Sequence, residues 1–117
     1  MTENWHDLVL EADFPADGKL AATVGGWHVL VARTEDGFHA VNDRCTHQAS
    51  PLSGGRIRRD AIICPLHGAR FEMKTGKCIG SAYADLRVFA VRVEKGMIAL
   101  SIPDTPPGMD ELPVITG

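Results

Sequence analysis

Two short segments that each hold a cysteine and a histidine constrain the fold of this chain more than any other feature. The first is Cys45-Thr46-His47 and the second is Cys64-Pro65-Leu66-His67-Gly68, with 16 residues between His47 and Cys64. Thiolates and imidazoles bind metals, and two of each suit either zinc or an iron–sulfur cluster. A single site made from all four side chains requires a fold that brings these two segments together.

The sequence around these segments predicts an all-β fold. Short apolar stretches alternate with glycine-containing turns, and no stretch has convincing helical periodicity. Turns at Thr34-Glu35-Asp36-Gly37 and Glu94-Lys95-Gly96 indicate two hairpins, and the second should place both of its apolar rows on one core face. The predicted strands are Trp5–Glu11, Lys19–Val24, Trp27–Arg33, Phe38–Asn42, Ile57–Ile63, Arg70–Met73, Phe89–Val93 and Ile98–Ile102.

The two Cys–His segments lie in the irregular parts of the chain, residues 43–56 and 64–84, which are rich in glycine, proline and serine. Irregular loops on a rigid scaffold are common places for chemistry. We therefore predict one domain over residues 1–103, with its metal-binding part at about 43–84. Residues 104–117 are predicted to be a C-terminal tail that lies on the surface or is poorly ordered.

The order of the four candidate ligands distinguishes between zinc and an iron–sulfur cluster. Zinc fingers usually take two cysteines from one loop and two histidines from a helix. Here each loop supplies one cysteine and one histidine, and no helix follows. A Rieske-type [2Fe–2S] cluster has this mixed ligand set, because two cysteines bind one iron and two histidines bind the other. A zinc-binding structural module stays open only if the cluster fails to assemble.

The two segments closely resemble the cluster-binding boxes of the Rieske family, and the resemblance covers about Trp27 to Ile102. It implies an antiparallel β-sandwich or barrel that carries one [2Fe–2S] cluster in a small subdomain made of two loops. It also implies that Cys45 and Cys64 bind the inner iron. His47 and His67 would then bind the outer iron, near solvent.

Departures from the high-potential respiratory members point to the soluble, low-potential ferredoxins of bacterial aromatic-ring-hydroxylating oxygenases. Ser50 and Leu66 stand where the respiratory proteins have a disulfide between the loops. Ala69 and Phe71 stand where those proteins have a serine and a tyrosine that donate hydrogen bonds to sulfur. The respiratory proteins are also anchored in a membrane, whereas we expect no anchor for this chain. Many members cover the cluster with a Gly-Pro-Ala-type loop, and this chain has Gly80-Ser81-Ala82 there.

This resemblance implies an electron carrier, not an enzyme, that takes single electrons from an NAD(P)H-dependent flavoprotein reductase and passes them to a terminal oxygenase. A catalytic oxygenase would need a second iron held by two histidines and a carboxylate, yet no histidine follows His67. No GxGxxG motif is available for a nucleotide. The small Rieske subunit of an assimilatory nitrite reductase is the alternative that the sequence leaves open.

Composition and the N-terminal sequence indicate the location of the protein in the cell and the partners that it lacks. The formal net charge of −3 argues weakly against a nucleic-acid partner. No apolar stretch is long enough to span a membrane, and the N-terminus lacks the pattern of a signal peptide. Three cysteines are too few for a disulfide scaffold. We therefore expect a cytoplasmic protein.

Other residues with chemical potential are expected to have structural roles. Cys78 has no paired histidine and is expected to be a free, partly buried thiol. The remaining histidines lie on or beside predicted strands, and the tryptophans are expected to pack in the core: His6, His28, His39, Trp5 and Trp27. Three arginines between the boxes should form a solvated face, with a partner-docking element as the alternative: Arg56, Arg58 and Arg59.

Overall fold

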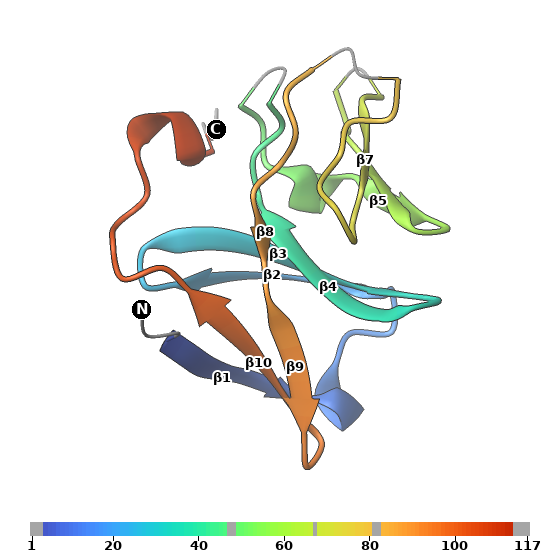
Figure 1. Cartoon of the computed structure of the whole chain (residues 1–117). Helices are drawn as coiled ribbons and strands as arrows, with labels where there is room; N and C mark the ends of the chain where they lie inside the picture. Colours follow the sequence, from blue (N-terminus) through green and yellow to red (C-terminus); the bar gives the residue numbers. More distant parts are fainter. Residues whose placement is uncertain (1–3, 47–48, 67, 81–82, 114–117) are drawn as a thin grey trace.

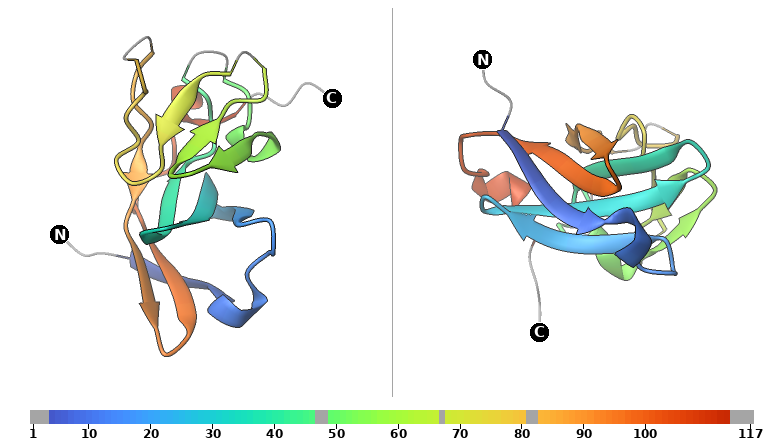
Figure 2. Two further views of the ribbon diagram at one scale, coloured as in Figure 1. Left: turned by 90° about the vertical axis from the view of Figure 1, so that its right-hand side faces the viewer. Right: turned by 90° about the horizontal axis from the view of Figure 1, so that it is seen from below.

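Three antiparallel sheets stack above one another in the computed structural model, which describes residues 4–46, 49–66, 68–80 and 83–113 (Figures 1 and 2). The first sheet has the order β1 (Asn4–Leu10), β10 (Met97–Ile102), β9 (Val91–Glu94). The second has the order β2 (Lys19–Val24), β3 (Trp27–Thr34), β4 (Gly37–Asn42), β8 (Val88–Phe89). The third has the order β5 (Arg56–Arg58), β6 (Ala61–Ile63), β7 (Arg70–Glu72). Short 3₁₀ helices cover Glu11–Asp13, Leu52–Gly54 and Met109–Glu111.

Strand β3 lies between two apolar cores, which explains its almost continuous apolar sequence. Val29 and Val31 pack into the core between the first and second sheets, with Trp27 at the end of the same strand. Leu30 and Ala32 pack into the core between the second and third sheets. Alternate residues of a strand point to opposite faces, so a strand between two cores is apolar on both. The all-β prediction is therefore confirmed, and so is the buried position of Trp27.

Two predicted strands are each divided in two. The predicted strand Ile57–Ile63 is the hairpin β5–β6, which turns at Arg59, a residue with a φ of 57°. Pairing places Ile57 opposite Ile62, so both apolar side chains share one face across the hairpin. The chain also changes sheets at Ala90, because β8 pairs with β4 and β9 pairs with β10.

The surface of the first sheet differs from the prediction at two side chains. The β9–β10 hairpin forms as predicted, but Val93 on β9 is 43% exposed, so only the β10 row is fully part of the core. Trp5 is half-buried, and the Arg92 guanidinium lies 4.4 Å from its ring centroid. An arginine over a tryptophan face is a cation–π contact. Trp5 therefore packs at the edge of the sheet and not in the core.

The chain after β10 returns along the second sheet, and its described part ends at Pro113. Trp27 Nε1 donates a hydrogen bond to the carbonyl of Thr105 (3.0 Å), and Asn42 Nδ2 donates one to the carbonyl of Glu111 (2.8 Å). Arg87 Nε donates to Glu111 Oε2 at 2.6 Å. Residues 104–113 thus lie on the surface, attached at several points. No helix among the described residues is long and apolar enough to cross a membrane.

Candidate metal centre

The loop after β4 carries the first Cys–His segment and is closed by two backbone hydrogen bonds. The N–H of Cys45 donates to the carbonyl of Ser50 at 2.8 Å, and the N–H of Ala49 donates to the carbonyl of Cys45 at 2.7 Å. Ala49 has a φ of 59°, in the left-handed region that alanine rarely adopts. These two hydrogen bonds close the first loop and position the cysteine at its start.

The loop after β6 repeats this arrangement at the second segment. The N–H of Cys64 donates to the carbonyl of Ala69 at 2.7 Å, and the N–H of Gly68 donates to the carbonyl of Cys64 at 3.2 Å. Gly68 has a φ of 76° and stands four residues after its cysteine, as Ala49 does in the first loop. The two loops have the same length and closure, so they present their cysteines in the same way.

The two cysteines lie in one apolar core, between the second and third sheets. Cys45 is 0% and Cys64 is 3% exposed, and both belong to the cluster of side chains that includes Ile62 and Phe71. Two buried sulfur ligands from two matching loops fit the cysteine half of a [2Fe–2S] site. The structure therefore brings together two of the four predicted ligands.

The predicted ligands His47 and His67 lie outside the described residues. Among the residues that are described, no group of three or more histidine, cysteine or acidic side chains is arranged to hold a metal ion. The sequence places the histidine third in the first loop and fourth in the second. The assignment of both histidines therefore stays a prediction.

A hydrogen-bond network centred on Ser53 holds in place the segment that connects the two loops. The buried Asp43 accepts a hydrogen bond from the N–H of Ser53 through Oδ1 at 2.7 Å. Lys19 Nζ donates to the carbonyl of Ser53 at 2.7 Å and also to the carbonyl of Gly55. A Cβ atom at Gly55 would overlap the carbonyl of Ile63, so this close approach requires glycine.

Sequence reasoning missed Lys19, because it lies on β2, 34 positions before Ser53 in the sequence. No local pattern marks such a residue. Asp43 carries a weak signal, because it stands just before the first segment, where a carboxylate can accept hydrogen bonds from loop N–H groups.

A third stretch, before β8, packs beside the two loops. Thr46 Oγ1 in the first loop donates to the carbonyl of Ala84 at 2.6 Å. Cys78 forms a β-bridge with Phe71, and its N–H donates to Asp85 Oδ1 at 3.1 Å. Cys78 is 2% exposed, so it is fully buried and not partly buried as predicted. Ser81 and Ala82 of the predicted cover lie outside the described residues.

The residues that distinguish this chain from respiratory relatives have clear structural settings. Ser50 closes the first loop through its carbonyl, and the side chain of Leu66 is 53% exposed. Ala69 closes the second loop through its carbonyl. The ring of Phe71 is fully buried in the same apolar core as Cys64. No disulfide is formed by the three cysteines, all of which lie in the described part of the chain.

The remaining histidines lie away from the two loops. His6 on β1 is exposed, while His28 on β3 and His39 on β4 are partly buried. The Nε2 atom of His39 is buried without a hydrogen-bond partner among the described residues. Their positions on strands agree with the structural roles that the sequence predicts.

Comparison with known proteins assigns the family. Residues 4–90 match the Rieske [2Fe-2S] domain, and this chain belongs to that family. Its cofactor is accordingly one [2Fe–2S] cluster of the Rieske type.

Named relatives share most of the chain. It is 30% identical over 103 residues to the ferredoxin component of the naphthalene 1,2-dioxygenase/salicylate 5-hydroxylase systems of a Ralstonia species, covering 87% of this chain and 99% of that one.

Solved structures share the fold. A chain from the complex of reduced oxygenase and oxidized ferredoxin in carbazole 1,9a-dioxygenase has a TM-score of 0.76 and 31% identity, covering 86% of this chain and 94% of that one. A putative NADH-dependent nitrite reductase small subunit from Mycobacterium tuberculosis has a TM-score of 0.79 and 18% identity, covering 88% and 98%.

Proposed function

We propose that this chain is the ferredoxin component of a ring-hydroxylating oxygenase system, a one-electron carrier with no catalytic activity of its own. The observation that carries this proposal is the pair of buried cysteines, Cys45 and Cys64, on two loops with the same closure. The ferredoxin from a naphthalene dioxygenase system, which matches over nearly its whole length, supports the choice of system.

We propose that Cys45 and Cys64 bind the inner iron of the cluster and that His47 and His67 bind the outer iron. When bound, the cluster accepts one electron and releases one electron. Metal ions bind cysteine as the thiolate. The positive charge of the iron would compensate the cost of placing the thiolate charges in an apolar core. Cys64 shares this core with the buried side chains of Ile62 and Phe71, and an apolar core excludes water.

The bracing of the loops has its own role in this proposal. Thr46 ties the first loop to the carbonyl of Ala84, and Asp43 and Lys19 hold the segment between the two loops through hydrogen bonds to the backbone of Ser53. A site that is held in one geometry needs little rearrangement when its charge changes. This bracing would therefore keep the first loop and the segment that connects it to the second loop in one geometry through both oxidation states.

The proposed partners are a flavoprotein reductase that oxidises NAD(P)H and a terminal oxygenase that carries out the hydroxylation. We place this exchange in the cytoplasm, where the reducing environment keeps cysteines available as ligands. The nitrite reductase alternative receives less support, since the likeness to the small subunit is 18% in sequence and thus concerns the fold.

Reconstitution tests the proposal. The holoprotein would be combined with NAD(P)H and the flavoprotein reductases and Rieske oxygenases encoded by the source organism, each purified. We expect aromatic hydroxylation only when reductase, this chain and an oxygenase are all present. Hydroxylation by the chain with a chemical reductant alone would contradict the carrier role, and so would failure with every reductase and oxygenase pair.

A further inference from the structure

Positive charge is concentrated in the part of the chain that holds the second Cys–His segment. Residues 56–84 contain six basic and two acidic side chains, a net charge of +4, while the rest of the chain has a net charge of −7. Such an uneven distribution in an acidic protein creates a local positive potential. The region next to the proposed cluster therefore attracts a negatively charged partner, which the acidic remainder of the chain repels.

The third sheet places these charges on one outer face. Pairing aligns Arg56, Ile63 and Arg70 in a row across the three strands. Paired residues of antiparallel strands share a face, and the neighbouring row, with Ile62 and Phe71, is buried in the core. The row with the two arginines must therefore face outward, and both arginines are exposed. Ile63 directly precedes Cys64, so this row lies at the base of the second loop.

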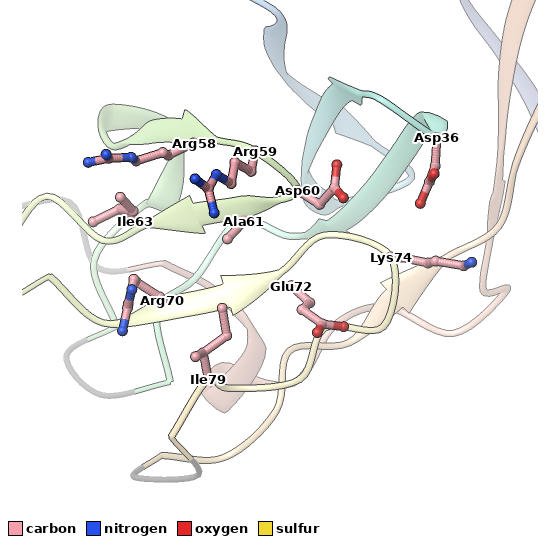
Figure 3. A pocket seen from close by; sticks show the side chains of 10 residues that line it. All are labelled: Asp36, Arg58, Arg59, Asp60, Ala61, Ile63, Arg70, Glu72, Lys74 and Ile79. Carbon is pink, nitrogen blue, oxygen red and sulfur yellow. The ribbon is translucent and has the colours of Figure 1, made fainter.

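A groove of about 680 Å³ runs along this face. Figure 3 shows Arg58, Arg59 and Arg70 around one end of the groove, with Ile63 between them and Ile79 below Arg70. Three acidic residues and one lysine lie toward the other end, as the same figure shows: Asp36, Asp60, Glu72 and Lys74. The groove is thus basic at one end and mixed in charge at the other.

Two exposed apolar side chains belong to this part of the molecule, one in the groove and one in the second loop. Ile79 lines the groove and is 41% exposed, and Leu66 in the second loop is 53% exposed. Protein interfaces combine an apolar centre with a polar rim that is enriched in arginine. Exposed Leu66 and Ile79, together with the exposed arginines of the third sheet, give this region such a composition. Leu66 also directly precedes the proposed ligand His67, where an electron would have to leave.

We propose that this surface, defined by Arg56, Arg58, Arg59, Arg70, Leu66 and Ile79, is the docking site for an acidic surface of the terminal oxygenase. The inference rests on the proposed function and adds to it the face that is used and the chemistry of the partner. The oxygenase is the chosen occupant because a ferredoxin 31% identical to this chain is known in complex with its oxygenase. The arginines steer the approach, and the apolar side chains exclude water from the contact.

The test is a charge reversal with a matched control. Arg58→Glu changes an exposed side chain of the docking surface, and Lys95→Glu makes the same change of charge in the β9–β10 turn, at the opposite end of the molecule from the two loops (Figure 1). Titration calorimetry would measure the Kd of each oxidised holoprotein for the purified oxygenase that the wild type reduces fastest. The cluster spectrum and midpoint potential of each variant would be recorded alongside.

We expect Arg58→Glu to raise the Kd about tenfold at low salt, which corresponds to about 1.4 kcal/mol. The difference should shrink as salt screens the charges, and Lys95→Glu should bind like the wild type. Reduction of Arg58→Glu by the reductase should keep the wild-type rate.

Three outcomes would overturn the docking inference or its basis. An unchanged Kd for Arg58→Glu would overturn the inference while the proposed function stands. A loss confined to reduction by the reductase would assign the face to the other partner and overturn it too. A wild-type chain that neither binds nor reduces any of the oxygenases would instead refute the proposed function itself.

Discussion

Ala49 and Gly68 occupy equivalent positions in the two loops, four residues after Cys45 and Cys64, and both have positive φ angles, 59° and 76°. Each donates its N–H to the carbonyl of the cysteine that begins its loop. One loop meets this backbone requirement with glycine and the other with alanine. Because the hydrogen bonds are the same, the identity of the residue is the main difference between the two positions.

Replacing the glycine with alanine and the alanine with glycine should change the free energy of unfolding in opposite directions. A left-handed conformation costs an L-residue about 1–2 kcal/mol, which the lower entropy of the unfolded alanine chain offsets in part. We expect Gly68→Ala to lower the free energy of unfolding by about 1 kcal/mol, and Ala49→Gly to raise it by a similar amount. Denaturant unfolding followed by circular dichroism would measure both.

Ala21→Gly on strand β2 is the control for this pair. Ala21 is exposed in the middle of a strand, where glycine is unfavourable by about 0.5–1 kcal/mol. The same substitution should therefore stabilise the protein at position 49 and destabilise it at position 21. If both variants lost stability equally, the left-handed backbone at Ala49 would have no energetic consequence.

The ligand assignment predicts different effects at two positions near the site. His67→Ala should remove or destabilise the cluster, because an iron would lose one of its two histidines. Cys78→Ala should keep the cluster and lose only some packing, since Cys78 is buried in the core without a role in the ligand set. Iron and acid-labile sulfide per chain, with the electron paramagnetic resonance spectrum of the reduced protein, would measure both. A bleached Cys78→Ala with an intact His67→Ala would reverse the assignment.

The midpoint potential should lie at the low end of the Rieske range, near about −150 mV and not near about +300 mV. Reduction adds a negative charge, so hydrogen-bond donors to sulfur favour the reduced state. A hydrogen bond to a charged group contributes roughly 1.5–3 kcal/mol, so each missing donor lowers the potential by roughly 60–130 mV. Ala69 and Phe71 each lack a hydroxyl group.

Ala69→Ser combined with Phe71→Tyr should raise the potential in a redox titration. Phe71 is fully buried in the same core as Cys64, so a hydroxyl group there has no water to bind and needs a partner inside the protein. The single variant Phe71→Tyr would measure the contribution of the hydroxyl group at position 71 separately from that of the serine at position 69. A wild-type value well above zero would contradict the expectation.

The ion pair of Arg87 and Glu111 should make attachment of the C-terminal segment dependent on pH. Burial raises the pKa of the Glu111 carboxyl, but hydrogen bonds from Arg87 and the N–H of Gly108, with the charge of Arg87, outweigh burial and hold the pKa below its usual 4.5. A carboxyl with a lowered pKa stabilises the fold above the unfolded value, and this contribution is lost as the pH falls through the folded value.

Glu111→Gln should therefore destabilise the protein by about 0.2–1 kcal/mol at pH 7, the range of partly exposed ion pairs. The difference from the wild type should shrink as the pH falls below 4.5 and vanish only below the lowered pKa of the folded protein, where the Glu111 carboxyl is protonated. Asp104→Asn, an exposed neighbour in the same segment, serves as the control and should change little. Unfolding curves at several pH values would measure this, and a difference independent of pH would contradict the ion-pair explanation.

Local sequence patterns were sufficient to predict the features that depend only on neighbouring residues. The strand Lys19–Val24 and the hairpins around Asp36 and Lys95 follow from alternation and turn residues within a few positions. The cofactor class follows from the order of cysteine and histidine in two short segments, and the family match confirms it. The division of predicted strands at Arg59 and Ala90 was not evident, because no glycine or proline marks these positions and pairing across the sheets decides them.

The sequence by itself determined the all-β class, the two Cys–His segments and the type of cluster, because alternation and ligand order are properties of neighbouring residues. Only the tertiary structure decided that the two loops share one closure, that Lys19 holds Ser53 across 34 residues, and that Arg56 and Arg70 stand in one outward row. These relationships depend on which strands pair and in which register. Strand pairing is selected by burial of the whole core, and no short segment of the chain encodes it.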